Sequence, residues 1–300
     1  MSDLDIIEEI VRYAPSATFT IEMDRCIKAD FTSSDETFIG SFRTLPRIEK
    51  EYVLHLINKL KSLKSLNLRK NRLSFVPEMD LPNIEHLDLA SNYMCEVPEW
   101  IKSCNLSYLN LGVNNLESIP DWISEFKELK VLKIHKNKLT NVDAIFGCKN
   151  LQFLNLYLNQ IQEIPNFIFS LPDIEFFSWG LSKITELSDD ICKWTKLKWL
   201  SLVANKLRYL PDSICTLQNL QALRVHKNNL CKLPENIGDL KNLEQISLYS
   251  NKLKSLPESF RKLKLKKCNL AFNEFEEKLN VVSDWLCLSS EDCKWIDKEI

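Results

Sequence analysis

The sequence predicts an α/β solenoid of about ten stacked repeats, with a parallel β-sheet on its concave side. Two periodic features carry this prediction. The first is a leucine pattern that ends in asparagine, L-x-x-L-x-L-x-x-N-x-L, and it begins with Leu63, Leu66, Leu68, Asn71 and Leu73. The second is a proline that recurs six residues after the repeat asparagine.

The asparagine position recurs every 21–23 residues, with a single serine in place of asparagine. The recurring positions are Asn71, Asn92, Asn114, Asn137, Asn159, Ser182, Asn205, Asn228, Asn251 and Asn273. Where a strand ends, an asparagine side chain can bond backbone groups that turn away from the sheet. Serine offers fewer such bonds, so we expect the sixth repeat, around Ser182, to be locally weaker or distorted.

The proline position supports the same register independently. It is occupied in seven repeats, by Pro77, Pro98, Pro120, Pro165, Pro211, Pro234 and Pro257, which are seven of the eleven prolines in the chain. We expect each proline, with the apolar pair that follows it, to form the return segment on the convex side. One repeat cannot bury its apolar face alone, so neighbouring repeats must stack.

These motifs resemble the leucine-rich-repeat family over about residues 60–278. The resemblance is to the intracellular type of 22–23 residues with Leu-Pro in the second half of the repeat. Ras-suppressor-like scaffolds and leucine-rich-repeat effectors of intracellular bacteria carry this type. The resemblance implies a curved solenoid, or horseshoe, that recognises proteins, while the exposed positions determine which partner is bound.

Residues 1–59 precede the repeats and are expected to form an N-terminal cap or a small docking segment with its own partner. Apolar spacing predicts a helix over residues 3–13. Phe19, Ile21 and Met23 then alternate with polar residues as in a strand.

The repeats are expected to occupy residues 60–274, followed by a C-terminal helical cap over residues 275–300. Four apolar residues at helical spacing support this cap: Phe275, Leu279, Val282 and Leu286. Such caps hide the apolar ends of a repeat array from water.

Side chains beside the central strand leucine are expected to point to the concave surface. Five consecutive repeats place a large apolar residue there, namely Tyr108, Val131, Phe153, Phe176 and Trp199, and adjacent positions add Tyr157, Leu158, Leu181 and Val203. Basic or histidine side chains bracket this stripe, among them Lys133, His135, Arg224 and His226, and Asp88 is the only acidic residue in these positions. We expect the stripe to bind a protein with acidic groups around an apolar patch. The alternatives are a ladder of aromatic rings that bury one another, and ordinary solvated charge.

No motif for catalysis, metal binding or a cofactor is present. The five glycines are widely separated, which excludes a phosphate-binding loop, and no C-x-x-C pair suggests a zinc site. His135 and His226 occupy the same repeat position four repeats apart, too far to share one metal ion. We therefore expect a chain without catalytic residues.

The N-terminal sequence does not resemble a signal peptide, and no apolar stretch is long enough to span a membrane. This favours a cytoplasmic protein with reduced cysteines, although delivery into a host cell without a cleavable signal stays open. The leading interpretation is a non-enzymatic scaffold or adaptor. Two alternatives are a substrate receptor that docks to a ubiquitin-ligase-type machine through residues 1–59, and a bacterial effector that acts on a host protein. The net charge of −2 disfavours nucleic acid as a partner.

Overall fold

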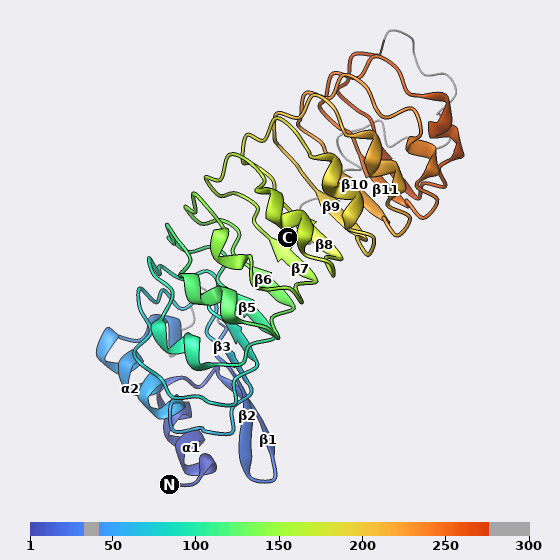
Figure 1. Ribbon diagram of the computed structural model, residues 1–300. Coiled ribbons are helices and arrows are strands. Elements are labelled where there is room, and N and C mark those ends of the chain that lie inside the picture. Colours follow the sequence, from blue (N-terminus) through green and yellow to red (C-terminus); the bar gives the residue numbers. More distant parts are fainter. Residues whose placement is uncertain (33–41, 276–300) are drawn as a thin grey trace. The chain divides into compact units, whose positions relative to one another are not determined.

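The computed structural model describes residues 1–32 and 42–275. It divides into two compact units, an N-terminal unit of Met1–Asn150 and a C-terminal unit of Leu151–Ile300. Each unit contains six strands, and within each unit the 3-10 helices of the repeats lie on the side opposite the strands (Figure 1).

The N-terminal unit begins with a cap and continues into four repeats. The cap comprises α1 (Asp3–Tyr13), β1 (Thr18–Glu22), β2 (Arg25–Asp30), the 3-10 helix η1 (Phe42–Thr44) and α2 (Arg47–Ile57). The repeat strands are β3 (Ser65–Asn67), β4 (His86–Asp88), β5 (Tyr108–Asn110) and β6 (Val131–Lys133). The return segments include the 3-10 helices η2 (Glu99–Ser103), η3 (Asp121–Glu125) and η4 (Asp143–Ile145).

The C-terminal unit contains six further strands, all parallel to their neighbours. They are β7 (Phe153–Asn155), β8 (Phe176–Ser178), β9 (Trp199–Ser201), β10 (Ala222–Arg224), β11 (Gln245–Ser247) and β12 (Lys267–Asn269). Its 3-10 helices are η5 (Asn166–Ser170), η6 (Asp189–Lys193), η7 (Asp212–Thr216), η8 (Ile237–Asp239) and η9 (Glu258–Lys262). Each strand residue pairs with the residue at the same position of the next repeat, so equivalent side chains form straight rows.

The repeat prolines begin the return segments, as the sequence predicts. Pro98, Pro120, Pro165, Pro211 and Pro257 each directly precede a 3-10 helix. Proline suits this N-cap place because its fixed φ is compatible with the extended backbone there.

The repeat asparagines form a buried ladder that joins each repeat to the one before it. In Asn228, Oδ1 accepts from the Leu207 amide at 3.0 Å, and Nδ2 donates to the carbonyls of Leu202 at 2.9 Å and Val225 at 3.0 Å. The same pattern recurs at Asn92, Asn114, Asn137, Asn205, Asn251 and Asn273. Because these side chains bond backbone groups of two repeats at once, the predicted repeat register is confirmed.

Ser182 departs from the ladder without disturbing the sheet. Its hydroxyl donates to the Gly180 carbonyl of its own repeat at 3.1 Å, whereas an asparagine there would also reach the preceding repeat. The expected distortion is absent from the strand, since β8 pairs in register with β7 and β9. Large aromatic side chains fill the core of this repeat instead, with the Phe177 and Trp194 ring centroids 4.6 Å apart.

The N-terminal cap is only partly as predicted. The helix over residues 3–13 is confirmed, and a capping box between Ser2 and Asp5 begins it. Phe19 and Ile21 lie in β1, but Met23 lies in the hairpin turn rather than in the strand. Sequence reasoning missed β2, which pairs with the first repeat strand, and α2, whose Lys50 donates a hydrogen bond to the Asn71 carbonyl of that repeat at 2.9 Å. Most of the expected C-terminal helix, from residue 276, lies outside the described residues.

Replacing Asn205 by leucine should destabilise the fold by about 1–3 kcal/mol, because buried backbone groups of two repeats lose their partners. Ser182→Ala removes one bond within a single repeat and should cost clearly less. Chemical denaturation followed by circular dichroism measures both. Equal midpoints for Asn205→Leu and wild type would contradict the ladder.

Candidate functional site

The sheet face of the C-terminal unit consists of three parallel rows of side chains. The first row is Phe153, Phe176, Trp199, Ala222, Gln245 and Lys267. The second row is Asn155, Ser178, Ser201, Arg224, Ser247 and Asn269. The third row follows the strands and is Tyr157, Gly180, Val203, His226 and Tyr249. Alternation along the strand points the first two rows away from the core.

Three half-buried rings of the first row form a continuous aromatic stack. The centroids of Phe153 and Phe176 are 3.9 Å apart with ring planes 5° from parallel, and those of Phe176 and Trp199 are 5.6 Å apart at 23°. The rings therefore bury part of one another, as the ladder alternative predicts, and each also keeps some exposed surface. We call Phe153, Phe176 and Trp199 the aromatic stack.

Arg224 extends the stack by placing its guanidinium carbon 4.0 Å from the Trp199 ring centroid. Stacking of a guanidinium on an indole is favourable, and more so away from water. Only 2% of Arg224 is exposed, so the expectation of a solvated basic residue at this position is corrected. It is a buried charge held against a ring.

Further apolar side chains lie in and beside the third row. The Tyr157 ring packs closely against Gly180, where a Cβ would come within 2.6 Å of the tyrosine ring. Leu158 and Leu181 are exposed beside this row, as expected. Val203, which was also expected to be exposed, is buried.

His226 is buried and does not present a free imidazole. Its Nδ1 lies 3.1 Å from the Ser247 hydroxyl, and its ring makes an edge contact with Tyr249 at 6.3 Å between centroids. This histidine therefore helps to order the third row rather than adding an exposed cation.

On the sheet face of the N-terminal unit, half-buried Tyr108 lies between His86 and Lys133. The His86 and Tyr108 centroids are 6.1 Å apart, and Lys133 Nζ is 5.6 Å from the tyrosine ring. Val131 is also half-buried. Asp88 accepts from the Asn110 side chain at 2.9 Å, and burial raises the pKa of its carboxyl.

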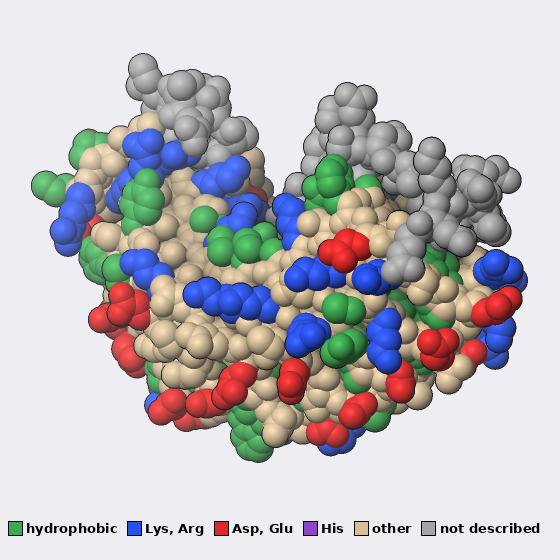
Figure 2. Space-filling view, turned by 90° about the horizontal axis from the view of Figure 1, so that it is seen from above, with side chains coloured by type: hydrophobic (Ala, Val, Ile, Leu, Met, Phe, Trp, Pro, Cys, Tyr) green, Lys and Arg blue, Asp and Glu red, His purple; other side chains and the backbone are tan. Residues whose placement is uncertain are grey.

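His135 contributes no charge to this face at neutral pH. It is buried against Gly112, and burial, with the nearby charges of Lys136 and Lys133, lowers its pKa to about 4. The positive charges that act on His135 are those of Lys136, Lys133 and Arg69. In Figure 2, lysine and arginine side chains extend across the middle of the view, and most acidic ones lie along its lower margin.

Many acidic side chains lie in the return segments, at one recurrent position. A carboxylate stands in the first turn of several 3-10 helices, at Glu99, Asp121, Asp143, Asp189, Asp212 and Glu258. Negative charge is favoured there by the exposed amide groups of a helix start. In four of these helices the acid directly follows the repeat proline.

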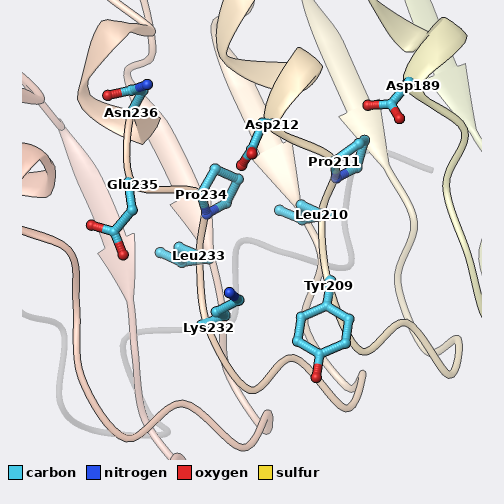
Figure 3. A pocket seen from close by; sticks show the side chains of 10 residues that line it. All are labelled: Asp189, Tyr209, Leu210, Pro211, Asp212, Lys232, Leu233, Pro234, Glu235 and Asn236. Atoms are coloured by element: carbon cyan, nitrogen blue, oxygen red, sulfur yellow. The ribbon is translucent and has the colours of Figure 1, made fainter.

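A groove of about 390 Å³ lies among these return segments in the C-terminal unit. Figure 3 shows Tyr209 and Lys232 at one end, Asp189 and Asp212 at the other, and Pro211 and Pro234 between them. Its charged side chains are exposed and come from successive repeats. Within residues 1–32 and 42–275, no cluster of three His, Cys, Asp or Glu residues could hold a metal ion.

The buried cysteines are poor nucleophiles. Burial raises the pKa of Cys148 to about 11, and it does the same for Cys26, Cys104 and Cys215. A thiol with such a pKa is protonated at neutral pH and does not attack an electrophile. The cysteines of the described ranges carry no disulfide, and no helix there is long and apolar enough to cross a membrane.

Comparisons with known proteins agree with the repeat geometry. A leucine-rich-repeat family model matches residues 104–161, and a second one matches residues 242–263. No curated protein sequence matches the chain.

Several solved structures share the fold. A leucine-rich-repeat protein of Leptospira interrogans is 28% identical with a TM-score of 0.56, and the match covers 80% of this chain and 71% of that one. The leucine-rich-repeat ectodomain of the Arabidopsis thaliana membrane receptor kinase GASSHO1/SCHENGEN3, in complex with CASPARIAN STRIP INTEGRITY FACTOR 2, is 28% identical with a TM-score of 0.64. That match covers 75% of this chain and 29% of the receptor chain.

The functional domain of InlJ from Listeria monocytogenes shares the fold at 23% identity and a TM-score of 0.63, over 74% of this chain and 47% of that one. The chain thus spans less than half of InlJ and of the plant receptor. Leucine-rich repeats typically serve as interaction modules rather than as enzymes. The recurrent motif, the asparagine ladder and the two family matches show that this chain is a leucine-rich-repeat protein with a solenoid fold.

Proposed function

We propose that this chain is a non-enzymatic scaffold or adaptor that binds a partner protein on the sheet face of its C-terminal unit. The aromatic stack of Phe153, Phe176 and Trp199 is the observation that carries the proposal. Tryptophan and other aromatic residues are favoured anchors at interfaces, since they bury a large area at a small cost in conformational entropy.

Leu158 and Leu181 support the same surface. Both are exposed and have positive φ values, of 56° and 53°. This left-handed conformation is energetically unfavourable for a bulky residue. The repeat imposes it at the equivalent positions Lys227 and Ser250 as well. The two exposed leucines beside the third row add apolar area suited to a protein surface.

Positive charge on the N-terminal unit would increase the rate at which the partner associates. Arg69 and Lys136 are exposed and Lys133 is half-buried. Such groups increase the rate of encounter with a partner that carries acidic groups, and salt screens this effect. His135 takes no part, because its low pKa keeps it neutral.

A substrate receptor that docks through residues 1–59 is the second candidate. The β1–β2 hairpin favours it, because Met23 in the turn is 96% exposed at a φ of 48°. In either role the free cysteines suit a reducing cytoplasm. The plant receptor of the comparison binds a partner in its solved complex, which supports protein binding by this fold class.

Phe153→Ala combined with Trp199→Ala should reduce partner capture from cell extract at least about tenfold, because each ring is an anchor contributing ~2 kcal/mol or more. Quantitative pull-down measures the loss. Tyr209→Ala, which removes a half-exposed ring from the return-segment groove, is the matched control and should capture normally.

The melting curve of the aromatic double variant must accompany this experiment. A variant that folds and still captures every partner would place binding elsewhere, first on residues 1–59. Loss of capture in Tyr209→Ala alone would assign binding to the groove.

Lys133→Glu combined with Lys136→Glu should slow association with the captured partner by about tenfold at low salt, with little effect on dissociation. Lys102→Glu with Lys127→Glu makes the same change in net charge on exposed return-segment residues and is the control. Surface plasmon resonance at increasing salt measures the rates. If both pairs slow association equally, net charge rather than the sheet face steers the partner.

A further inference from the structure

The second row of the C-terminal unit contains three buried serines that differ in one respect. Ser178, Ser201 and Ser247 are 1%, 2% and 1% exposed. The Ser247 hydroxyl bonds to His226 Nδ1 at 3.1 Å. The hydroxyls of Ser178 and Ser201 have no hydrogen-bond partner among the residues that the structure describes.

A buried hydroxyl without a partner is unfavourable, and alanine would fill the same space without that cost. Hydrogen bonds within the described fold therefore do not explain why serine stands at these two positions. They neighbour each other in the register of β8 and β9, and each lies two residues after a ring of the aromatic stack. Both hydroxyls are thus placed along the edge of the proposed partner surface.

Arg224 is the next residue of the same row and pairs in register with Ser201. Its guanidinium already lies against Trp199, the last ring of the stack. Two hydroxyls and one guanidinium therefore stand in consecutive repeats beside the rings. All three can donate hydrogen bonds, and the guanidinium can only donate.

We propose that Ser178, Ser201 and Arg224 form a subsite for the carboxylate of an aspartate or glutamate side chain of the partner, with an apolar residue of the same segment packed on the aromatic stack. This assignment rests on the proposed function, because it places the acid within the same interface. The subsite makes the expectation of an acidic partner specific, because it assigns the acid to a contact with Ser178, Ser201 and Arg224.

The charge of the row selects a carboxylate over other anions. Arg224 is the only charged member of the second row, so the row offers one positive charge and neutral donors. A carboxylate matches that charge and can accept the guanidinium in a bidentate manner. A phosphate carries nearly two negative charges, of which the row would leave about one uncompensated.

Because Ser178 and Ser201 are buried, access to the subsite requires a neighbouring side chain to rotate. Rotamer changes of this kind are common when protein interfaces form. Burial then strengthens the contact, because an anion that reaches the two hydroxyls is shielded from water.

The test uses a phage-displayed library of random peptides selected on the full chain. Only peptides that fail to bind the double variant Phe153→Ala/Trp199→Ala are kept. Binding of each retained peptide therefore depends on the aromatic stack. We expect them to share an aspartate or glutamate next to an aromatic or aliphatic residue. Changing that acid to its amide should weaken binding about 10- to 100-fold, as measured by titration calorimetry.

A double-mutant cycle assigns the contact. Arg224→Gln should weaken binding as much as the amide change does, and the two losses should not add. Ser201→Ala should weaken binding, whereas Ser247→Ala, in the same row on the other side of Arg224, should not. If Arg224→Gln fails to fold, the comparison of Ser201→Ala with Ser247→Ala still tests the subsite.

Additive losses in the cycle, or equal effects of the two serine variants, would overturn the subsite. Retained peptides without a shared acid would also overturn it and leave the proposed function intact. If every selected peptide binds the aromatic double variant as tightly as wild type, the proposed function fails together with the subsite.

Discussion

The asparagine ladder is the constraint on which the rest of the structure depends. Each ladder side chain bonds backbone groups of its own repeat and of the preceding one, so a repeat cannot slip by a residue without leaving buried groups unpaired. The fixed register then aligns equivalent positions into rows. A row of three aromatic rings, and a row with two serines beside an arginine, are consequences of that alignment.

The same constraint separates the two kinds of charge. Strand positions that point away from the core carry cations such as Lys133 and Lys267, and the first turns of the 3-10 helices carry acids such as Asp121 and Asp212. A chain with a net charge of −2 can therefore carry cations on the sheet side of its repeats. Composition alone says little about partners when a repeat fold sorts its residues in this way.

Much of the fold could be predicted from the sequence because two positions recur with a fixed structural role. The asparagines form the hydrogen-bonded ladder, and the prolines begin the return segments. The cap could not, since α2 and β2 lie outside the period and depend on contacts with the first repeat. Periodicity also predicts which way a side chain points but not its burial. Arg224 and His226 point to the predicted face. The Arg224 guanidinium nevertheless stacks on Trp199, and His226 is hydrogen-bonded to Ser247.

A photo-cross-linking residue in place of Phe176 tests the central claim most directly, because this ring is the middle member of the aromatic stack. The same residue in place of Tyr209 reports on the opposite, return-segment groove. Irradiation in cell extract followed by mass spectrometry should join a partner protein at position 176 and leave position 209 without it. The same partner cross-linked at 209 and not at 176 would contradict the account.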